Sequence, residues 1–224
     1  MDFRNDEMHE ELLAVYKDFA ENAVAPLAAE LDEQERFPEE LIPTMAEMGL
    51  MGIPFPEEYG GTGMDELSYA QCIEEISKKC ASTGVTLSGH TSLCCWPIYH
   101  WGTEEQKKKY LPDLCSGKKL GAFGLTEAGA GTDAAGQKTV AEDKGDYYLL
   151  NGSKMFTTNA GFADIKNADK YGVTTDNISC DINKMIELRS STIEKIRTSL
   201  EKNIYHINGI GIDEKRLINN FFKN

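Results

Sequence analysis

The chain has 224 residues, of which 41% are hydrophobic and 27% charged, so we expect a buried core rather than a disordered chain. Its formal net charge of -14 argues against nucleic acid or an anionic membrane as a partner, because such surfaces repel an acidic protein. We find no apolar run long enough to span a membrane and no apolar export signal at the N-terminus. The six cysteines include no CxxC pair, which favours reduced thiols and a cytoplasmic location.

The first half of the chain is predicted to be helical. Apolar residues recur at helical spacing over about 6–24, and Pro26 is expected to kink or restart the helix there. A second helix is predicted from 38 or 39 to 48, because a proline suits the first turn and Gly49 is placed to end it.

Two more helices are predicted before the pattern changes. The first covers about 65–80 and has Asp65 as its N-cap. The next covers about 82–100 and is apolar on most sides, which is typical of a buried helix. Thr103 and Gln106 follow with the spacing of a capping box, which predicts the start of a further helix.

The apolar helix also contains residues that raise the question of a metal site. His90 and Cys94 lie four positions apart, and Cys95 and His100 are close in sequence. We favour the alternative, a small and partly buried helix face, because isolated residue pairs match such motifs by chance.

From Leu120 the pattern becomes strand-like. LGAFGLTE, KTVAED and DYYLLNGSKMFTT are predicted to form short strands, and Asn151-Gly152 predicts a two-residue hairpin turn. The fold class is therefore α+β, with an all-helical domain over 1–118 and a partial antiparallel β-barrel over 119–165.

A second change falls near Ile165. Acidic residues outnumber basic ones before it, whereas basic residues are in slight excess after it. Isoleucines then recur at helical spacing, and a turn at NGIG precedes another short amphipathic stretch. Residues 166–224 are therefore predicted to form a helical hairpin, a third domain of unknown origin.

Two stretches carry a resemblance to a known family. GLTEAGAGTDAAG, residues 124–136, fits a signature of the acyl-CoA dehydrogenase family position by position. NGSKMFTTN, residues 151–159, resembles the next flavin-contacting strand of that family, and the helical region resembles its N-terminal domain. The likeness covers about 1–165 and is strongest to the short-chain, butyryl-CoA branch of anaerobic bacteria. It does not extend to 166–224.

The resemblance implies an oxidoreductase with FAD as cofactor and a short-chain acyl-CoA as substrate. It also implies a flavin or thioester pocket formed by seven residues: Phe123, Leu125, Thr126, Gly131, Thr132, Phe156 and Thr158. Thr132 corresponds to a position that contacts the acyl-CoA in relatives. We identify no metal ligand and no catalytic residue in the chain.

Each of these residues has a plainer interpretation. Gly129 and Gly131 also suit a tight turn, and Glu127 and Asp133 more often cap turns than serve a site. Phe156 taken alone is more often a core residue. The flavin interpretation is favoured because both motifs occur together and in the expected order.

The resemblance also implies a reaction, the α,β-dehydrogenation of an acyl-CoA. A carboxylate removes the α-proton, and hydride leaves the β-carbon for the flavin N5. The family takes this carboxylate from a glutamate of its C-terminal helical domain. Intact relatives are homo-oligomers that pass electrons to an electron-transfer flavoprotein.

We find no counterpart of that glutamate in the tail. Glu187, Glu194 and Glu201 recur every seven residues, which is typical of a solvated helix face. We therefore expect a truncated form that lacks the catalytic-base domain and is inactive alone. The alternative is a non-catalytic remnant or interaction protein whose helical tail binds a partner.

Overall fold

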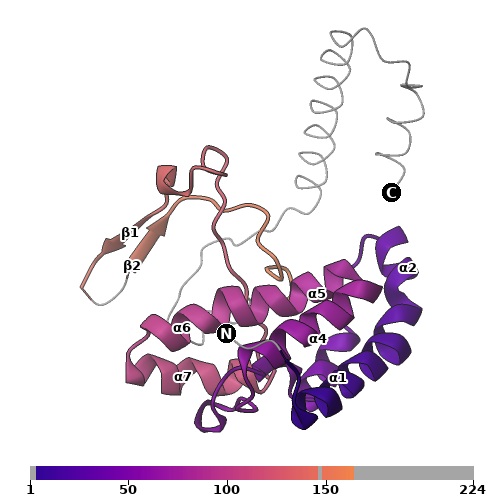
Figure 1. Cartoon of the computed structure of the whole chain (residues 1–224). Coiled ribbons are helices and arrows are strands. Elements are labelled where there is room, and N and C mark those ends of the chain that lie inside the picture. The colour runs from indigo at the N-terminus through magenta and orange to yellow at the C-terminus, as the bar shows by residue number, and fades with distance from the viewer. Residues whose placement is uncertain (1–3, 146–147, 164–224) are drawn as a thin grey trace, which may run out of the picture. The chain divides into compact units, whose positions relative to one another are not determined.

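The computed structural model describes residues 4–145 and 148–163 (Figure 1). The chain divides into two units, 1–174 and 175–224, and all the described residues belong to the first. The helical hairpin predicted for 166–224 lies outside the described residues. Among those described, no helix is long and apolar enough to cross a membrane.

The N-terminal helix continues past Pro26 to Glu33 and restarts at this proline, as predicted. It consists of α1 (Glu7–Phe19), a π-helical turn (Ala20–Val24) and α2 (Ala25–Glu33). Pro26 lies in the first turn of α2 and has no N–H to donate. The wider π-helical turn directly before Pro26 accommodates this missing donor, so the helix restarts without a break.

The second predicted helix begins later than expected. It is α3 (Leu41–Glu47), and Gly49 follows it with φ +72°, the left-handed conformation that glycine adopts most easily at helix ends. Two short 3₁₀ turns, Leu50–Gly52 and Glu57–Tyr59, then lead to the next helix.

The predicted caps of two later helices are confirmed. The Asp65 side chain accepts a hydrogen bond from the Ser68 amide at 2.9 Å and starts α4 (Glu66–Lys79). Thr103 and Gln106 form both bonds of the capping box that starts α7 (Glu104–Cys115).

The apolar helix predicted over 82–100 is present but is interrupted in its middle. It consists of α5 (Ala81–Ser88), a π-helical turn (Gly89–Cys95) and α6 (Trp96–Trp101). Pro97 lies in the first turn of α6, so the wider turn again directly precedes a proline.

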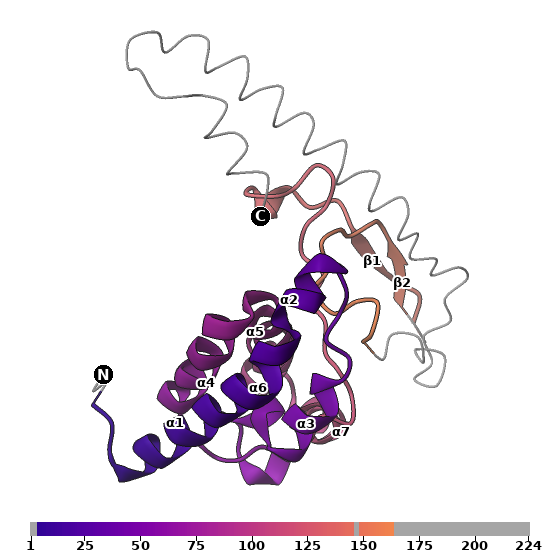
Figure 2. The same ribbon diagram turned by 90° about the vertical axis from the view of Figure 1, so that its right-hand side faces the viewer.

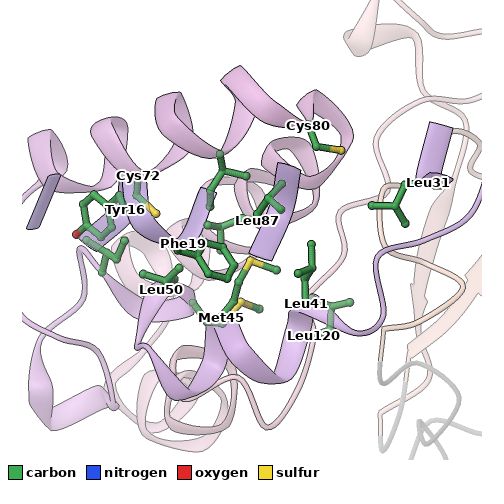
Figure 3. Close-up of a cluster of buried hydrophobic side chains, with 14 residues drawn as sticks. Tyr16, Phe19, Leu31, Leu41, Met45, Leu50, Cys72, Cys80, Leu87 and Leu120 are labelled. Atoms are coloured by element: carbon green, nitrogen blue, oxygen red, sulfur yellow. The ribbon is translucent and has the colours of Figure 1, made fainter. Parts of the chain in front are cut away.

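The main core lies between the long helices. Helix α4 packs against α1 on one side and α5 on the other, as Figures 1 and 2 show. Figure 3 shows the buried side chains between them, which include Phe19, Met45 and Leu87. Burying each large apolar side chain contributes about 1.5–3 kcal/mol. The buried side chains of this core therefore hold the helices together.

A second cluster links α7 to the π-helical turn Gly89–Cys95. Phe55 is fully buried, and its ring contacts Tyr99 edge-on with 5.6 Å between the ring centroids. Cys95 and Cys115 are buried in the same cluster. The position of α7 is therefore fixed against the turn that precedes α6.

The described sheet consists of two antiparallel strands, β1 (Val140–Asp143) and β2 (Tyr148–Asn151). Asn151 pairs with Val140 and Tyr148 pairs with Asp143. All described side chains of both strands are exposed. The larger partial barrel stays a prediction, as does the boundary between the first two predicted domains.

Three predictions about this region are wrong. The strand structure predicted over DYYLLNGSKMFTT ends at Asn151, and residues 152–159 form no strand. LGAFGLTE forms no strand, and the chain there has only an isolated bridge between Glu127 and Ala130. Asn151-Gly152 is not the hairpin turn, because Asn151 lies in β2. The turn instead follows Asp143, whose side chain accepts a hydrogen bond from the Gly145 amide at 2.8 Å. Gly145 has φ +91°, so this Asp-Lys-Gly sequence supplies the turn that the Asn-Gly pair was expected to form.

His9 connects the N-terminal ends of α1 and α4. Its Nδ1 lies 2.7 Å from Asp6 Oδ1, and its Nε2 lies 3.0 Å from Asp65 Oδ2. The hydrogen bond with Asp65, reinforced by Asp6, raises the pKa of His9 above its ordinary value of 6.5. The ring therefore bridges the two capping carboxylates, and these carboxylates favour its protonated form.

We predict that Leu87→Ala destabilises the fold by about 2–5 kcal/mol, because it removes a fully buried side chain and leaves a cavity. Val85 lies on the same helix but is 54% exposed, so Val85→Ala should change the stability by less than about 0.5 kcal/mol. Urea denaturation followed by circular dichroism measures both. Equal losses in the two variants would contradict the position of the core.

We further predict that the His9 bridge stabilises the chain more at low pH than at high pH. Because the pKa of His9 is raised on folding, its contribution is fully present below pH 6.5 and is lost as the pH rises through the folded-state pKa. Thermal melting between about pH 6 and about pH 9 should show a decline that is smaller in His9→Gln. Identical declines in both proteins would exclude the bridge.

Candidate functional site

Two segments that are distant in sequence meet beside the helical domain. The Met155 amide donates a hydrogen bond to the Thr126 carbonyl at 2.8 Å. A β-carbon added at Gly124 would lie 3.3 Å from Lys154 Cγ and 3.5 Å from Thr157 Oγ1, so these two side chains lie close to the Gly124 backbone. We call residues 123–126 and 155–158 the paired segments.

The paired segments contain five of the seven predicted pocket residues. These are Phe123, Leu125, Thr126, Phe156 and Thr158. Three of their side chains are large, apolar and uncovered by the described residues, with exposed fractions of 36% for Phe123, 41% for Leu125 and 67% for Phe156. Exposed apolar side chains on neighbouring segments are typical of surfaces that bind a ligand or partner, so the paired segments are the candidate site.

Phe156 differs from the plainer interpretation in which it belongs to the core. It is exposed, and its φ of +57° lies in the left-handed region that non-glycine residues rarely adopt. Unfavourable backbone conformations of this kind concentrate at functional sites, where the surrounding structure maintains them.

The other two predicted residues lie on an exposed loop. Glu127 and Ala130 exchange two backbone hydrogen bonds of 3.1 Å, which close a tight turn, and Gly131 and Thr132 come directly after it. Both are exposed, and a β-carbon added at Gly131 would meet nothing within 4 Å. The turn is therefore formed by Glu127 to Ala130, and crowding does not require glycine at position 131.

Glu127 holds this loop rather than presenting a free carboxylate. Its side chain accepts hydrogen bonds from the amides of Lys138 (2.6 Å) and Thr139 (3.0 Å). It also forms an ion pair with the Lys154 ammonium at 2.7 Å. The Lys138 amide and then the Lys154 ammonium lower the pKa of Glu127 to about 2. Glu127 was predicted to cap a turn, but its carboxylate instead holds the backbone 11 and 12 positions further along the chain.

Lys154 is a residue that the sequence did not single out. Besides Glu127, its ammonium donates to the Leu125 carbonyl at 3.0 Å and to the Gln137 side chain. It therefore ties the first paired segment to the loop that follows it. A lysine within NGSKMF gives no sequence signal for this role, because its partners lie 17 to 29 positions away.

A hollow of about 300 Å³ lies beside the turn. It is lined by Glu127, Ala128, Gly129, Gly136, Lys138, Thr139, Gly152 and Ser153. None of the seven predicted pocket residues is among them, so the hollow is distinct from the apolar surface of the paired segments.

The paired segments are attached to the helical domain at the π-helical turn Gly89–Cys95. A β-carbon added at Gly89 would lie 3.1 Å from Thr158 Cγ2, so the two residues are in close contact. The buried Asn159 side chain donates to the Thr86 carbonyl at 2.9 Å. Gly121 donates its N–H to His90 Nδ1 at 2.8 Å, which accounts for one ring nitrogen of this histidine.

No metal site is found in the part of the chain that the structure describes. Within residues 4–145 and 148–163, no three His, Cys, Asp or Glu side chains are placed to hold an ion. His90 is fully buried, and burial lowers its pKa to about 4, so the ring is neutral at physiological pH.

Comparison with protein families identifies both described domains. Residues 6–118 match the acyl-CoA dehydrogenase N-terminal domain, and residues 122–175 match the acyl-CoA dehydrogenase middle domain. The chain belongs to the acyl-CoA dehydrogenase family, as its motifs predicted.

The similar proteins point to one branch of this family. The chain is 56% identical over 164 residues to the short-chain specific acyl-CoA dehydrogenase of Clostridium acetobutylicum. The aligned segment makes up 73% of this chain and 43% of that protein. The chain therefore spans less than half the length of this curated relative. Over the aligned segment it is similar to short-chain, butyryl-CoA-type dehydrogenases.

Solved structures share the described fold. Butyryl-CoA dehydrogenase from Megasphaera elsdenii has a TM-score of 0.68 at 46% identity, covering 73% of this chain and 44% of that one. A chain from a structure described as the electron transferring flavoprotein of Acidaminococcus fermentans scores 0.70 at 51% identity, covering 73% and 43%. Acyl-CoA dehydrogenase complexed with FAD from Bacillus anthracis scores 0.67 at 41% identity, covering 71% and 28%.

We predict that Glu127→Gln loosens the loop over 127–139. The amide side chain cannot offer two charged acceptor oxygens to Lys138 and Thr139, so hydrogen exchange at these two amides should accelerate several-fold. Glu142 is exposed and pairs with Lys144, so Glu142→Gln is the matched control and should leave both amides unchanged. Unaltered exchange in Glu127→Gln would show that the carboxylate does not hold the loop.

Proposed function

We propose that the paired segments form one wall of the flavin and thioester pocket of a short-chain acyl-CoA dehydrogenase. The observation that carries the proposal is their exposed apolar surface, which lies on the two motifs that resemble flavin-contacting sequence in the family. The relatives support a short acyl chain, since several are described as short-chain specific. The chain spans less than half the length of these relatives. The dehydrogenation reaction is therefore proposed for a protein that also contains the remaining part of the family's fold.

FAD is the proposed cofactor, and the residues present suit it. An isoalloxazine ring needs a flat apolar surface with hydrogen-bonding groups at its edge. Phe123, Leu125 and Phe156 offer the apolar surface, and the hydroxyls of Thr126 and Thr158 offer donors and acceptors beside it. When bound, the flavin supplies the acceptor for the hydride that leaves the β-carbon.

The residues of this chain would bind and orient rather than transfer the α-proton. We propose that the paired segments exclude water from one face of the ring and that Thr132 contacts the acyl-CoA. Glu127 is unsuited as the base, because its carboxylate already has three partners and its pKa is held at about 2. The base is therefore proposed to come from elsewhere, as in the family.

The proposed electron acceptor is an electron-transfer flavoprotein. The resemblance to the family supports this, as does the likeness to a chain in the structure described as the electron transferring flavoprotein of Acidaminococcus fermentans. The described residues by themselves identify no docking surface for it.

We predict that the purified 224-residue chain binds FAD but does not turn over butyryl-CoA by itself. Flavin fluorescence quenching measures binding, and dye reduction measures turnover. Phe156→Ala should weaken FAD binding several-fold because it removes apolar contact area from the wall. The exposed residue Val140 lies on β1 outside the paired segments, so Val140→Ala is the matched control.

The whole short-chain dehydrogenase of Clostridium acetobutylicum serves as the positive control for both measurements. Absence of FAD binding in the isolated chain, or equal weakening by Phe156→Ala and Val140→Ala, would contradict the proposed wall. Dye reduction by the isolated chain would contradict the proposed need for an external base. Persistence of this activity in Thr126→Ala would also contradict the proposed role of Thr126.

A further inference from the structure

Both backbone polar groups of Gly121 are held by side chains from other parts of the chain. Its N–H donates to Nδ1 of His90 at 2.8 Å, and its carbonyl accepts from Nδ2 of Asn159 at 3.1 Å. His90 lies 31 positions before Gly121 and Asn159 lies 38 positions after it. All three residues are buried, so each unmade bond would leave a polar group without water. We call these three residues the Gly121 clamp.

The histidine of the clamp has a defined tautomer. An amide N–H can only donate, so Nδ1 of His90 must be the acceptor, and the proton of the neutral ring is then on Nε2. Nε2 lies 3.5 Å from Cys95 Sγ, a buried thiol that accepts weakly. This arrangement orients the ring toward Gly121.

The asparagine of the clamp meets two requirements at once. Its φ is +67°, a conformation that asparagine and glycine tolerate better than most residues. Its side-chain Nδ2 donates both to the Gly121 carbonyl and to the Thr86 carbonyl of α5. This fixes the orientation of the amide, because the flipped amide would place Oδ1 against two carbonyl oxygens. Asn159 therefore binds the chain beyond Thr158 to α5 and to Gly121 together.

The clamp works only because position 121 has no side chain. A β-carbon there would lie 2.6 Å from Cys94 Sγ and 2.7 Å from Cys94 Cβ. The backbone of Gly121 thus lies directly against the π-helical turn, within hydrogen-bond distance of His90 Nδ1.

We propose that His90 and Asn159 are positioning residues that set the two paired segments against each other. The inference rests on the proposed function, in which these segments form the flavin wall. Gly121 lies two residues before Phe123, and Asn159 lies one residue after Thr158, so the clamp joins the outer ends of the wall. Neither side chain is proposed to touch the flavin or the substrate. Their effect is transmitted through the backbone that carries Phe123 and Thr158.

The test compares variants that keep or remove the acceptor for the Gly121 N–H. In His90→Asn, the side-chain oxygen takes the place of Nδ1, whereas His90→Leu has no acceptor. Asn159→Gly keeps the left-handed backbone but removes both donors. In the full-length chain, we expect FAD to bind about tenfold more weakly in His90→Leu and Asn159→Gly, and near wild-type strength in His90→Asn. Circular dichroism selects conditions in which every variant is folded.

A second measurement on the wild-type chain needs neither FAD nor a variant. Nitrogen-15 NMR should show His90 with an unprotonated Nδ1 and a protonated Nε2, and a Gly121 amide that is strongly protected from exchange. An exposed Gly121 amide or the opposite tautomer would overturn the clamp even if the variants do not fold.

The outcomes separate the clamp from the proposed function. If the wild-type chain does not bind FAD while the NMR signatures are present, the flavin assignment fails, and the positioning role that rests on it fails with it. If the wild-type chain binds FAD and all variants bind it equally, only the positioning role is wrong. FAD binding that is retained in His90→Asn but weakened in His90→Leu supports the positioning role. A purely steric role of His90 would not distinguish the acceptor of asparagine from the apolar group of leucine, which has nearly the same shape.

Discussion

The hydrogen bonds that hold Gly121 join three parts of the chain that are far apart in sequence. His90 belongs to the π-helical turn, Gly121 begins the chain that leads to the first paired segment, and Asn159 follows the second. The turn is buried at His90, Thr91 and Cys95, and the clamp joins it to a region with little regular structure. Under the proposed positioning role, the placement of Phe123 and Phe156 depends on this connection.

Local signals in the sequence predicted the helical part well. Asp65 and Thr103 cap helices as expected, because capping depends on residues only three positions apart. Prediction failed where two local signals competed. Asn151-Gly152 is a strong turn sequence, but Asp143 and Gly145 form the turn, and the pairing of Tyr148 to Asn151 with β1 then leaves Asn151 in a strand.

The candidate site was predicted in part. Resemblance to the family selected Phe123, Leu125, Thr126, Phe156 and Thr158, which the structure brings together on the paired segments. Sequence reasoning considered His90 only as a possible metal ligand and did not single out Lys154 or Asn159. The roles of these three residues consist of bonds to residues 17 to 73 positions away. A histidine in an apolar helix and an asparagine after two threonines give no local indication of such partners. These contacts follow only from the tertiary fold.

The central claim is that the paired segments form the flavin wall and that the clamp holds them in place. Nitrogen-15 NMR of the full chain during a titration with FAD tests this most directly. The account predicts chemical-shift changes at the amides of 123–126 and 155–158, with those of β1 unchanged. Changes confined to other residues, or none at FAD concentrations that saturate an intact short-chain dehydrogenase, would contradict it.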